Sequence, residues 1–183
     1  PELAEVEFYR RRWAAGHGDR ITAVLVHDRA RLFRDCDPRA LVRGLKGATL
    51  RDSAAAAKQM LFRCGARKWL GIHLGMSGEL RVEPADYSPA KHDHLVLRQA
   101  RRSLVFTDPR MFGAVLWHEG AQPPAWWTDI APAVLSEEFT PAVVRDFLQR
   151  RRRAPIKAVL LMQERFPGIG NWMADEILWR ARL

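Results

Sequence analysis

The sequence is poor in cysteine, and it has no long apolar run. Its two cysteines, Cys36 and Cys64, are too few for a disulfide framework or for a four-cysteine zinc site, so both are predicted to be buried thiols. No apolar run approaches the roughly 20 residues needed to span a bilayer, and no signal-like apolar block follows a basic start. We therefore expect a cytoplasmic protein without a membrane partner.

The charge balance is strongly positive. The 183 residues include 30 lysines and arginines against 21 aspartates and glutamates, a formal net charge of +9. Such a field favours polyanions, because each phosphate that an Arg or Lys neutralises releases condensed counterions. A basic but otherwise ordinary surface explains the charge alone nearly as well. Hydrophobic residues make up 48% of the chain, which indicates a globular protein with a substantial core.

Hydrophobic periodicity predicts an α+β fold that begins with a β-sandwich. Short stretches rich in Val, Leu and Ile are typical of its strands; they cover residues 21–27, 70–74, 94–97, 104–107 and 114–118. A helix is expected over residues 2–14, with acidic residues in its first turn, where they oppose the helix dipole. Asp37 and Pro38 predict the start of a short helix that ends at Leu45.

The composition changes at residues 120–124, where two prolines interrupt the strand pattern. We assign residues 1–120 to an N-terminal β-sandwich domain, 121–135 to a loop-like linker and 136–183 to an all-helical domain. Helices in that domain are predicted over residues 140–153 and 155–167, and from residue 171 to the end. Because the last pattern is still amphipathic at Leu183, we expect the sequence to be a fragment cut after its second domain.

The sequence begins with a proline followed directly by a glutamate, which places a secondary amine beside a proton donor. An α-amino group has an ordinary pKa of about 7.7–8.0, so part of it is neutral and nucleophilic at physiological pH. If the nitrogen of Pro1 attacks a sugar aldehyde carbon and expels the attached base, the resulting iminium is permanently cationic and serves as an electron sink for strand cleavage by elimination. The alternative is that Pro1 remains after removal of an initiator methionine and merely starts a helix.

Three further segments join this start. They read His-Leu-Gly-Met-Ser-Gly at residues 73–78; Lys-His-Asp-His at 91–94 with Thr-Asp-Pro-Arg-Met-Phe-Gly at 107–113; and Ile-Lys at 156–157 leading to Pro-Gly-Ile-Gly-Asn at 167–171. Together with residues 1–7, they resemble the formamidopyrimidine-DNA glycosylase and endonuclease VIII family of base-excision repair enzymes, in the same order and over almost the whole chain. The last segment is similar to that family's helix-two-turns-helix DNA-binding motif.

The resemblance implies catalytic roles for three residues. Pro1 is the nucleophile that forms a Schiff base with the lesion sugar, Glu2 is the acid that helps to open the sugar ring, and Lys58 lies on a loop that approaches the damaged nucleotide and assists elimination. Alanines at positions 54–57 replace the residues that usually precede this lysine, and an ordinary exposed lysine is the alternative. The alternative for Glu2 is a first-turn carboxylate that opposes the helix dipole.

The resemblance also implies that Met76, Arg110 and Phe112 enter the duplex where the damaged nucleotide is extruded. Chemistry on a base requires that base to leave the stack, and an apolar wedge with a guanidinium can fill the gap. Taken alone, Met76 and Phe112 would be interpreted as core residues. Met111 stands where bacterial formamidopyrimidine enzymes commonly have a second arginine, which leaves the lesion preference open.

Four residues match phosphate-contacting positions of the family: His92, Arg152, Lys157 and Asn171. Gly168 and Gly170 are expected to let the backbone come close to a DNA strand, and the helix that follows offers free N–H groups. The alternative is a tight turn between helices, with Asn171 as the N-cap. His92 and His94 could form half of a metal site, but their neighbours supply no convincing further ligands.

These residues imply a base-excision repair DNA glycosylase with abasic-site lyase activity. Its partner is double-stranded DNA with a damaged base or an abasic site, oxidised purines are favoured, and the protein is expected to be a monomer associated with the nucleoid through DNA. A non-catalytic relative that binds damaged DNA and an endonuclease VIII-like enzyme for oxidised pyrimidines are the alternatives. The family's four-cysteine zinc hairpin is absent, so no metal or other cofactor is expected in this chain, and a structural zinc only in a longer form.

Overall fold

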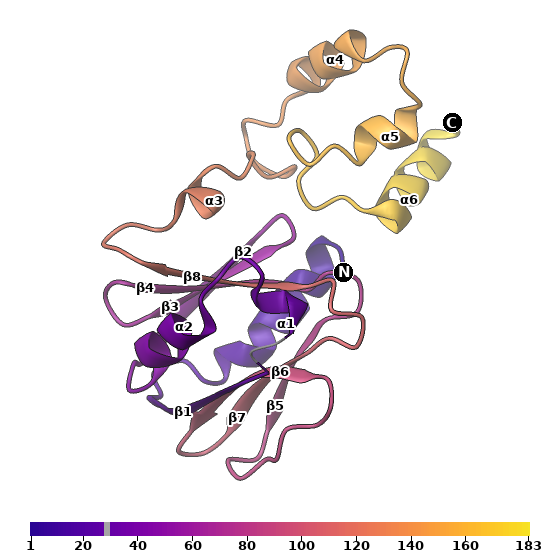
Figure 1. The fold of residues 1–183 in the computed structure, drawn as a ribbon. Helices are drawn as coiled ribbons and strands as arrows, with labels where there is room; N and C mark the ends of the chain where they lie inside the picture. The colour runs from indigo at the N-terminus through magenta and orange to yellow at the C-terminus, as the bar shows by residue number, and fades with distance from the viewer. Residues whose placement is uncertain (28–29) are drawn as a thin grey trace.

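The computed structural model describes residues 1–27 and 30–183, which form a two-sheet domain followed by a helical domain (Figure 1). The elements are, in order, α1 (Leu3–Ala14), β1 (Ile21–Val26), the 3-10 helix η1 (Arg31–Phe33), α2 (Pro38–Leu45), β2 (Leu50–Ala56), β3 (Gln59–Cys64), β4 (Lys68–His73), β5 (Glu79–Glu83), β6 (Asp93–Gln99), β7 (Ser103–Thr107), β8 (Ala114–Glu119), α3 (Ala125–Thr128), α4 (Pro141–Arg150), α5 (Ile156–Leu160) and α6 (Asn171–Ala181). Among the described residues, no helix combines the length and the apolar character needed to cross a bilayer.

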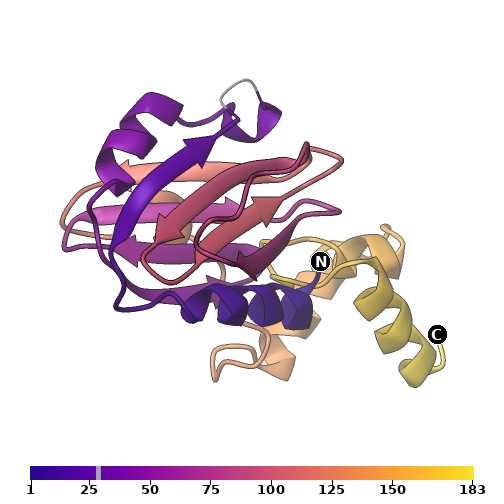
Figure 2. The same ribbon diagram turned by 90° about the horizontal axis from the view of Figure 1, so that it is seen from below.

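The first domain consists of two antiparallel four-stranded sheets, in the orders β1-β6-β7-β5 and β2-β3-β4-β8. Helix α1 contacts the edge strands β5 and β2, whereas α2 contacts β1 and η1 contacts β8. Helices therefore lie along both open sides of the sandwich (Figure 2). Because they cover strand edges that would otherwise offer unpaired N–H and C=O groups, they protect the domain from edge-to-edge pairing.

The core of the sandwich is filled from both sheets and from α1. Trp13 of α1 is fully buried, its ring centroid lies 5.1 Å from that of Phe62, and its indole N–H donates to the carbonyl of Arg81 at 3.1 Å. Other buried members of this cluster include Leu41, Leu45, Leu70, Ile72, Leu95, Leu97, Leu104 and Phe106. Burial of these side chains fixes α1, and with it the position of the N-terminus, against the sheets.

The predicted α+β class is confirmed, and the five predicted strands correspond to β1, β4, β6, β7 and β8. The sequence analysis missed β2, β3 and β5. Strand β2 reads Leu-Arg-Asp-Ser-Ala-Ala-Ala, a composition with low strand propensity. It is extended because it pairs with β3 and lies under α1. Such tertiary contacts leave no periodic signal in the sequence.

The helical domain has its own core, in which Phe147 of α4 and Phe166 pack with ring centroids 5.8 Å apart. The predicted start of α4 is confirmed, since the Thr140 hydroxyl accepts a hydrogen bond from the N–H of Val143 at 3.3 Å. The predicted helix over residues 155–167 is wrong, because α5 ends at Leu160. Beyond it the side chain of Gln163 bonds to the backbone of the chain and holds a turn.

The segment between the domains is less loop-like than predicted, because it contains α3. Trp126 of this helix packs on β4, where a Cβ added at Gly71 would lie only 2.4 Å from the Trp126 ring. The third predicted helix begins at Asn171 as expected but ends at Ala181, since Arg182 adopts the left-handed conformation. The structure thus differs from the prediction in the bounds of single elements, while the predicted elements follow one another in the correct order.

The two cysteines differ in burial. Cys64 is buried, as predicted, whereas the prediction for Cys36 is wrong because its side chain is only partly buried. Burial raises the pKa of Cys64 to about 12 and that of Cys36 to about 11. Both therefore remain protonated thiols near neutral pH and are poor nucleophiles.

Candidate active site

The carboxylate of Glu2 joins the two domains. Glu2 precedes α1 and is only 7% exposed. Its Oε1 accepts a hydrogen bond from the backbone N–H of Trp172 at 3.0 Å, and its Oε2 accepts one from that of Met173 at 3.1 Å. These N–H groups belong to the first turn of α6, where the helix dipole attracts an anion. The sequence analysis did not foresee this long-range contact.

Two glycines make room for this contact. A Cβ added at Gly170 would lie 2.3 Å from Oε1 of Glu2, and one added at Gly168 would lie 2.2 Å from the Leu3 side chain. Gly168 also has a φ of +88°, which disfavours any residue with a side chain. The sequence analysis explained both glycines by the approach of a DNA strand. The structure shows a further reason for both glycines, because it brings the turn against the start of the chain itself.

Pro1 is partly buried and directly precedes Glu2, whose carboxylate lies at the boundary of the two domains. In Figures 1 and 2 the N-terminus lies close to the segment that leads into α6. The backbone N–H of Glu2 donates to Oε2 of Glu5 at 2.8 Å, which ties the start of the chain to the first turn of α1. The predicted nucleophile and the predicted acid are thus held on one rigid element.

Lys58 lies in the turn between β2 and β3, next to Ala57, whose φ is +53°. The turn faces a cavity of about 380 Å³ between the sandwich, the inter-domain segment and the turn after α5. Its lining residues are Ala57, Lys58, Gln59, His73, Asp129, Ile130, Ala131, Gln163, Glu164 and Pro167. The position is therefore not that of an isolated surface lysine, because its neighbours come from both domains.

His73 is a site residue that the sequence analysis passed over, although it begins the quoted segment 73–78. Burial lowers its pKa, and the positive charges of Lys58 and of the amino terminus lower it further. Its Nδ1 accepts a hydrogen bond from the N–H of Gly75 at 3.1 Å. Lys58 and His73 line the same cavity, and with its pKa lowered the imidazole is neutral near pH 7.

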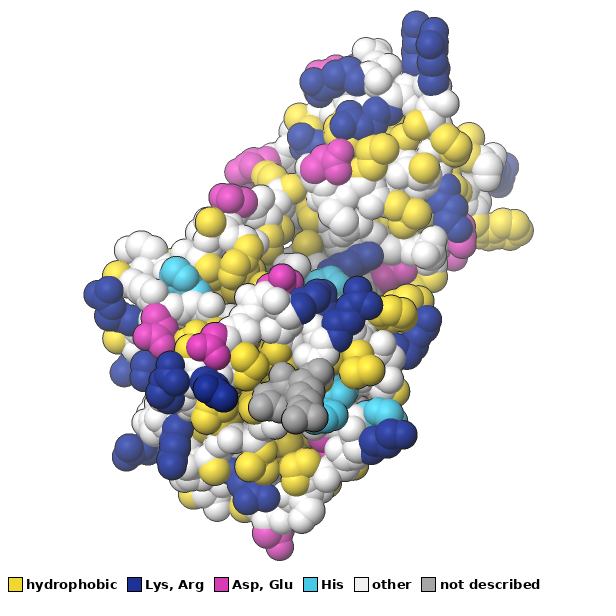
Figure 3. All heavy atoms as spheres, in the orientation of Figure 1, with side chains coloured by type: hydrophobic (Ala, Val, Ile, Leu, Met, Phe, Trp, Pro, Cys, Tyr) yellow, Lys and Arg dark blue, Asp and Glu magenta, His cyan; other side chains and the backbone are white. Residues whose placement is uncertain are grey.

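The residues predicted to enter the duplex are exposed. Met76 and Phe112 are 63% and 46% exposed, so the alternative interpretation as core residues is wrong. They lie on the β4–β5 and β7–β8 loops, and the Arg110 guanidinium lies 5.0 Å from the centroid of the Phe112 ring. Large apolar side chains that remain exposed together indicate a binding surface. On the face shown in Figure 3, Lys and Arg side chains gather where the sandwich meets the helical domain.

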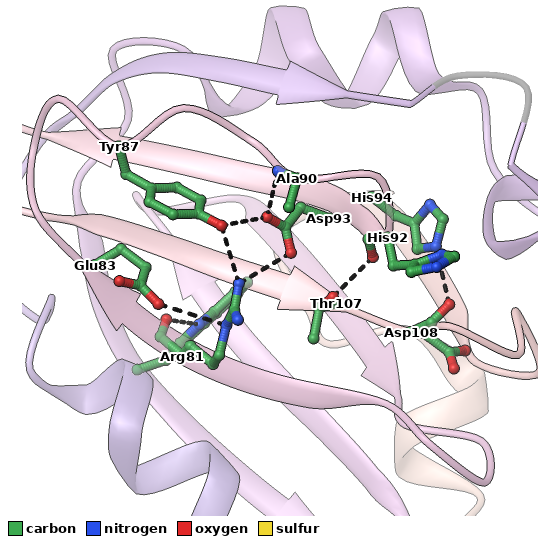
Figure 4. Close-up of polar contacts among 10 residues, drawn as sticks. Arg81, Glu83, Tyr87, Ala90, His92, Asp93, His94, Thr107 and Asp108 are labelled. Atoms are coloured by element: carbon green, nitrogen blue, oxygen red, sulfur yellow. Dashed lines mark hydrogen bonds and ion pairs between the residues drawn. The ribbon is translucent and has the colours of Figure 1, made fainter.

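His92 is partly buried, and a polar network fixes its backbone (Figure 4). Its carbonyl accepts hydrogen bonds from the Thr107 hydroxyl at 2.9 Å and from the N–H of Asp108 at 3.0 Å. The next residue, Asp93, accepts bonds from the Tyr87 hydroxyl at 2.6 Å and from Arg81 at 3.0 Å. Burial alone would raise the pKa of Asp93, but hydrogen bonds, from Tyr87 and the N–H of Ala90 above all, and the positive charge of Arg81 outweigh it and hold the pKa below its ordinary value.

The remaining predicted phosphate contacts come from the helical domain. Arg152 is exposed in the turn after α4, and Asn171 is exposed as the first residue of α6. The alternative interpretation of Asn171 as an N-cap is wrong, because Gly170 occupies that position. Lys157 of α5 is already paired, with its Nζ 2.6 Å from Oδ1 of Asp175. A phosphate that binds Lys157 must therefore compete with the carboxylate of Asp175.

Two family models match this chain. The formamidopyrimidine-DNA glycosylase N-terminal domain matches residues 1–115, and the formamidopyrimidine-DNA glycosylase H2TH domain matches residues 130–183. The chain belongs to the formamidopyrimidine-DNA glycosylase family. Among its relatives, the formamidopyrimidine-DNA glycosylase of Xanthomonas axonopodis pv. citri (strain 306) is 39% identical, with 99% of this chain and 66% of the relative covered. The protein of the same name from Geobacter sulfurreducens is 40% identical, with 100% and 67% covered.

Solved structures of the family have the same fold. Wild-type Lactococcus lactis Fpg, in complex with DNA that contains an oxidised pyrimidine, has a TM-score of 0.87 and 30% identity; the match covers 100% of this chain and 69% of that protein. MutM in complex with DNA that contains carbocyclic 8-oxo-G has a TM-score of 0.87 and 28% identity, with 100% and 70% covered. This chain thus spans about two thirds of the length of the relatives it matches.

The zinc hairpin that the resemblance implies for longer family members cannot be built from the residues present. The sequence has two cysteines, and among residues 1–27 and 30–183 no group of three or more His, Cys, Asp or Glu side chains could hold a metal ion. His94 is buried, with its Nε2 3.0 Å from the carbonyl oxygen of Asp108, and its ring stacks on that of His27. The His94 ring is thus engaged in packing and in a backbone contact.

Proposed function

We propose that this chain is a base-excision repair DNA glycosylase with abasic-site lyase activity, acting as a monomer on damaged double-stranded DNA. The observation that carries the proposal is the position of Glu2, the residue that follows Pro1, whose buried carboxylate is fixed by two N–H groups of α6. A general acid must be held within reach of the reacting group, and a carboxylate locked between two domains meets that requirement.

The proposed chemistry starts at the nitrogen of Pro1. The nitrogen attacks C1′ of the deoxyribose of the damaged nucleotide, and the bond to the base breaks with the base as the leaving group, which takes a proton from water. The Glu2 carboxylate takes up the proton that the amine loses and donates it to the ring oxygen as the bond between C1′ and that oxygen breaks, which opens the sugar and forms the iminium. The resulting iminium withdraws electrons, so loss of a proton from C2′ expels the 3′ phosphate. Lys58, on its turn at the inter-domain cavity, assists this elimination. No cofactor carried by this chain takes part.

The proposed substrates are oxidised bases, with purines preferred. The solved relatives support this class, because they include Lactococcus lactis Fpg with DNA that contains Fapy-dG and MutM with DNA that contains carbocyclic 8-oxo-G. Another complex, with an oxidised pyrimidine, shows that a related protein binds the alternative class as well. Competition between duplexes that contain each lesion would establish the order of preference for this chain.

The proposed DNA interface combines a wedge with phosphate contacts. Met76, Arg110 and Phe112 fill the space that the extruded nucleotide leaves, and their exposure fits that role. The phosphate contacts are His92, Arg152, Lys157 and Asn171. Replacing Lys157 by alanine should weaken binding to all duplexes alike and reduce the slope of log affinity against log salt by about one unit. An unchanged slope would remove Lys157 from the interface.

Borohydride trapping tests the catalytic proposal directly. A duplex with an abasic site or with oxidised guanine should give a covalent adduct under reducing conditions, because borohydride reduces the iminium on Pro1. A variant with one extra residue before Pro1 should lose the adduct and keep its DNA affinity. Measurable DNA binding without trapping would favour the non-catalytic alternative, whereas trapping by the blocked variant would assign the nucleophile to another amine.

A further inference from the structure

One buried carboxylate joins the two loops that carry the exposed wedge. Asp108 has no exposed surface, and its side chain is fully engaged in hydrogen bonds. Its Oδ1 accepts from the Ser77 hydroxyl at 2.6 Å, and its Oδ2 accepts from the N–H of Gly113 at 2.8 Å. The N–H of Arg110 donates to the Ser77 hydroxyl at 3.2 Å and to Oδ1 of Asp108 at 3.3 Å.

The two loops are also in backbone contact. Gly75 has a φ of +64°, and a Cβ added there would lie 2.4 Å from the carbonyl carbon of Phe112 and 2.5 Å from the nitrogen of Gly113. No side chain fits between them. Met76 follows Gly75 directly, so the position of Met76 relative to Phe112 is set by this contact and by the Ser77–Asp108 bond.

The backbone of Asp108 extends the same connection to a third segment. Its N–H donates to the carbonyl of His92 at 3.0 Å, and its own carbonyl lies 3.0 Å from Nε2 of His94 (Figure 4). Asp108 thus contacts every segment of the sandwich that carries a proposed DNA contact other than Lys58. A charge buried in this way must have its partners in place, because an unpaired carboxylate in the interior is strongly unfavourable.

We propose that Asp108 and Ser77 are positioning residues for base extrusion, which hold Met76, Arg110 and Phe112 as one preorganised wedge. This inference rests on the proposed function, since it assigns the wedge to the step in which the damaged nucleotide leaves the stack. Unstacking a base is costly. A wedge whose loops must first be ordered would lose binding energy to that ordering, so rigid loops make extrusion faster.

The test compares two serine-to-alanine variants on the same domain. Ser77→Ala removes the bond to Asp108, whereas Ser103→Ala removes a buried serine hydroxyl on β7 that donates to the carbonyl of Ala85. Stopped-flow fluorescence of a base analogue placed beside the lesion measures extrusion, and borohydride trapping at a preformed abasic site measures chemistry that needs no base to be extruded.

Ser77→Ala should slow the extrusion phase about tenfold, in line with the cost of small misplacements at reacting centres, and change trapping at the abasic site by less than about twofold. Ser103→Ala should leave both readouts unchanged, and Ser77→Thr, which keeps the hydroxyl, should restore extrusion. Equal extrusion rates for the two alanine variants would overturn the positioning role. If the unmodified protein extrudes the base but never traps, the proposed function fails instead.

Discussion

The ion pair between Lys157 and Asp175 leads to a specific prediction about DNA affinity. The two side chains are 40% and 61% exposed, and their charged atoms lie 2.6 Å apart. If Lys157 contacts a phosphate, it must first leave Asp175. Replacing Asp175 by asparagine should therefore strengthen DNA binding, because the lysine is released and a carboxylate that repels the phosphate is removed.

The expected magnitude follows from the exposure of the pair. Exposed ion pairs contribute about 0.2–1 kcal/mol, and about 1.4 kcal/mol corresponds to a tenfold change in affinity. Asp175→Asn should therefore lower the dissociation constant by about 1.4- to 5-fold. The gain should shrink as the salt concentration rises, because salt screens both the internal pair and the phosphate contact.

Fluorescence anisotropy with an undamaged duplex, measured over a series of salt concentrations, checks this prediction. Glu176→Gln is the matched control, since it removes the same charge from α6 at a residue that pairs with Arg180 instead. Equal affinity of the two variants would show that Asp175 does not compete with phosphate. A gain that persists in a Lys157→Ala background would assign the effect to net charge rather than to release of the lysine.

Three further substitutions test the turn that holds the Glu2 carboxylate and the stability of α1. Gly170→Ala should slow base excision by tenfold or more, because the new Cβ would lie 2.3 Å from Oε1 of Glu2. Its affinity for undamaged DNA should be nearly unchanged, and an equal loss of affinity in fluorescence anisotropy would contradict the prediction. Gln163→Met removes the side-chain hydrogen bonds that hold the turn before Gly170 and should likewise lower the rate of single-turnover base excision. A normal rate would show that the turn keeps its shape without these bonds. The hydrogen bond from Arg10 lowers the pKa of Glu7 to about 2 from an ordinary 4.5, so the stability that Glu7 contributes is present above pH 4.5 and lost as the pH falls toward 2. Glu7→Gln should thus lower the free energy of unfolding by about 1 kcal/mol or less near neutral pH, given the exposure of the pair, and by clearly less near pH 2 in urea titrations; a difference that does not vary with pH would refute the assignment.

The sequence predicts the order of the elements and the loop positions of Met76 and Phe112 better than it predicts their contacts. The turn residues around Met76 and Phe112 and the resemblance place both side chains on loops, and the structure exposes them. Their connection through Asp108 is not visible in the sequence, because Ser77 and Asp108 lie 31 positions apart and belong to different loops, each of which joins the two sheets. The sequence alone does not distinguish a buried aspartate from an exposed one.

The helical domain shows the same limit. The sequence marks Gly168 and Gly170 as positions of close approach, but it does not show that the start of the chain, at Leu3 and Glu2, packs against them in the structure. Similarly, the basic side chain of Lys157 fits a phosphate site, whereas its pairing with Asp175 depends on how α5 packs against α6. Long-range packing decides these cases, and periodicity within one segment carries no information about it.

The contacts of Glu2 couple the arrangement of the two domains to the position of the proposed acid. Both carboxylate oxygens accept hydrogen bonds from α6, while the backbone of the same residue begins α1 on the sandwich. Any rotation of the helical domain against the sandwich must therefore stretch these bonds or carry the carboxylate with it. Because the bonds to a charged acceptor are among the stronger hydrogen bonds in proteins, the arrangement that preserves them is favoured. A duplex that binds both domains without separating α6 from Glu2 would thus find the acid already in place beside Pro1, and one that forces the domains apart would disable it.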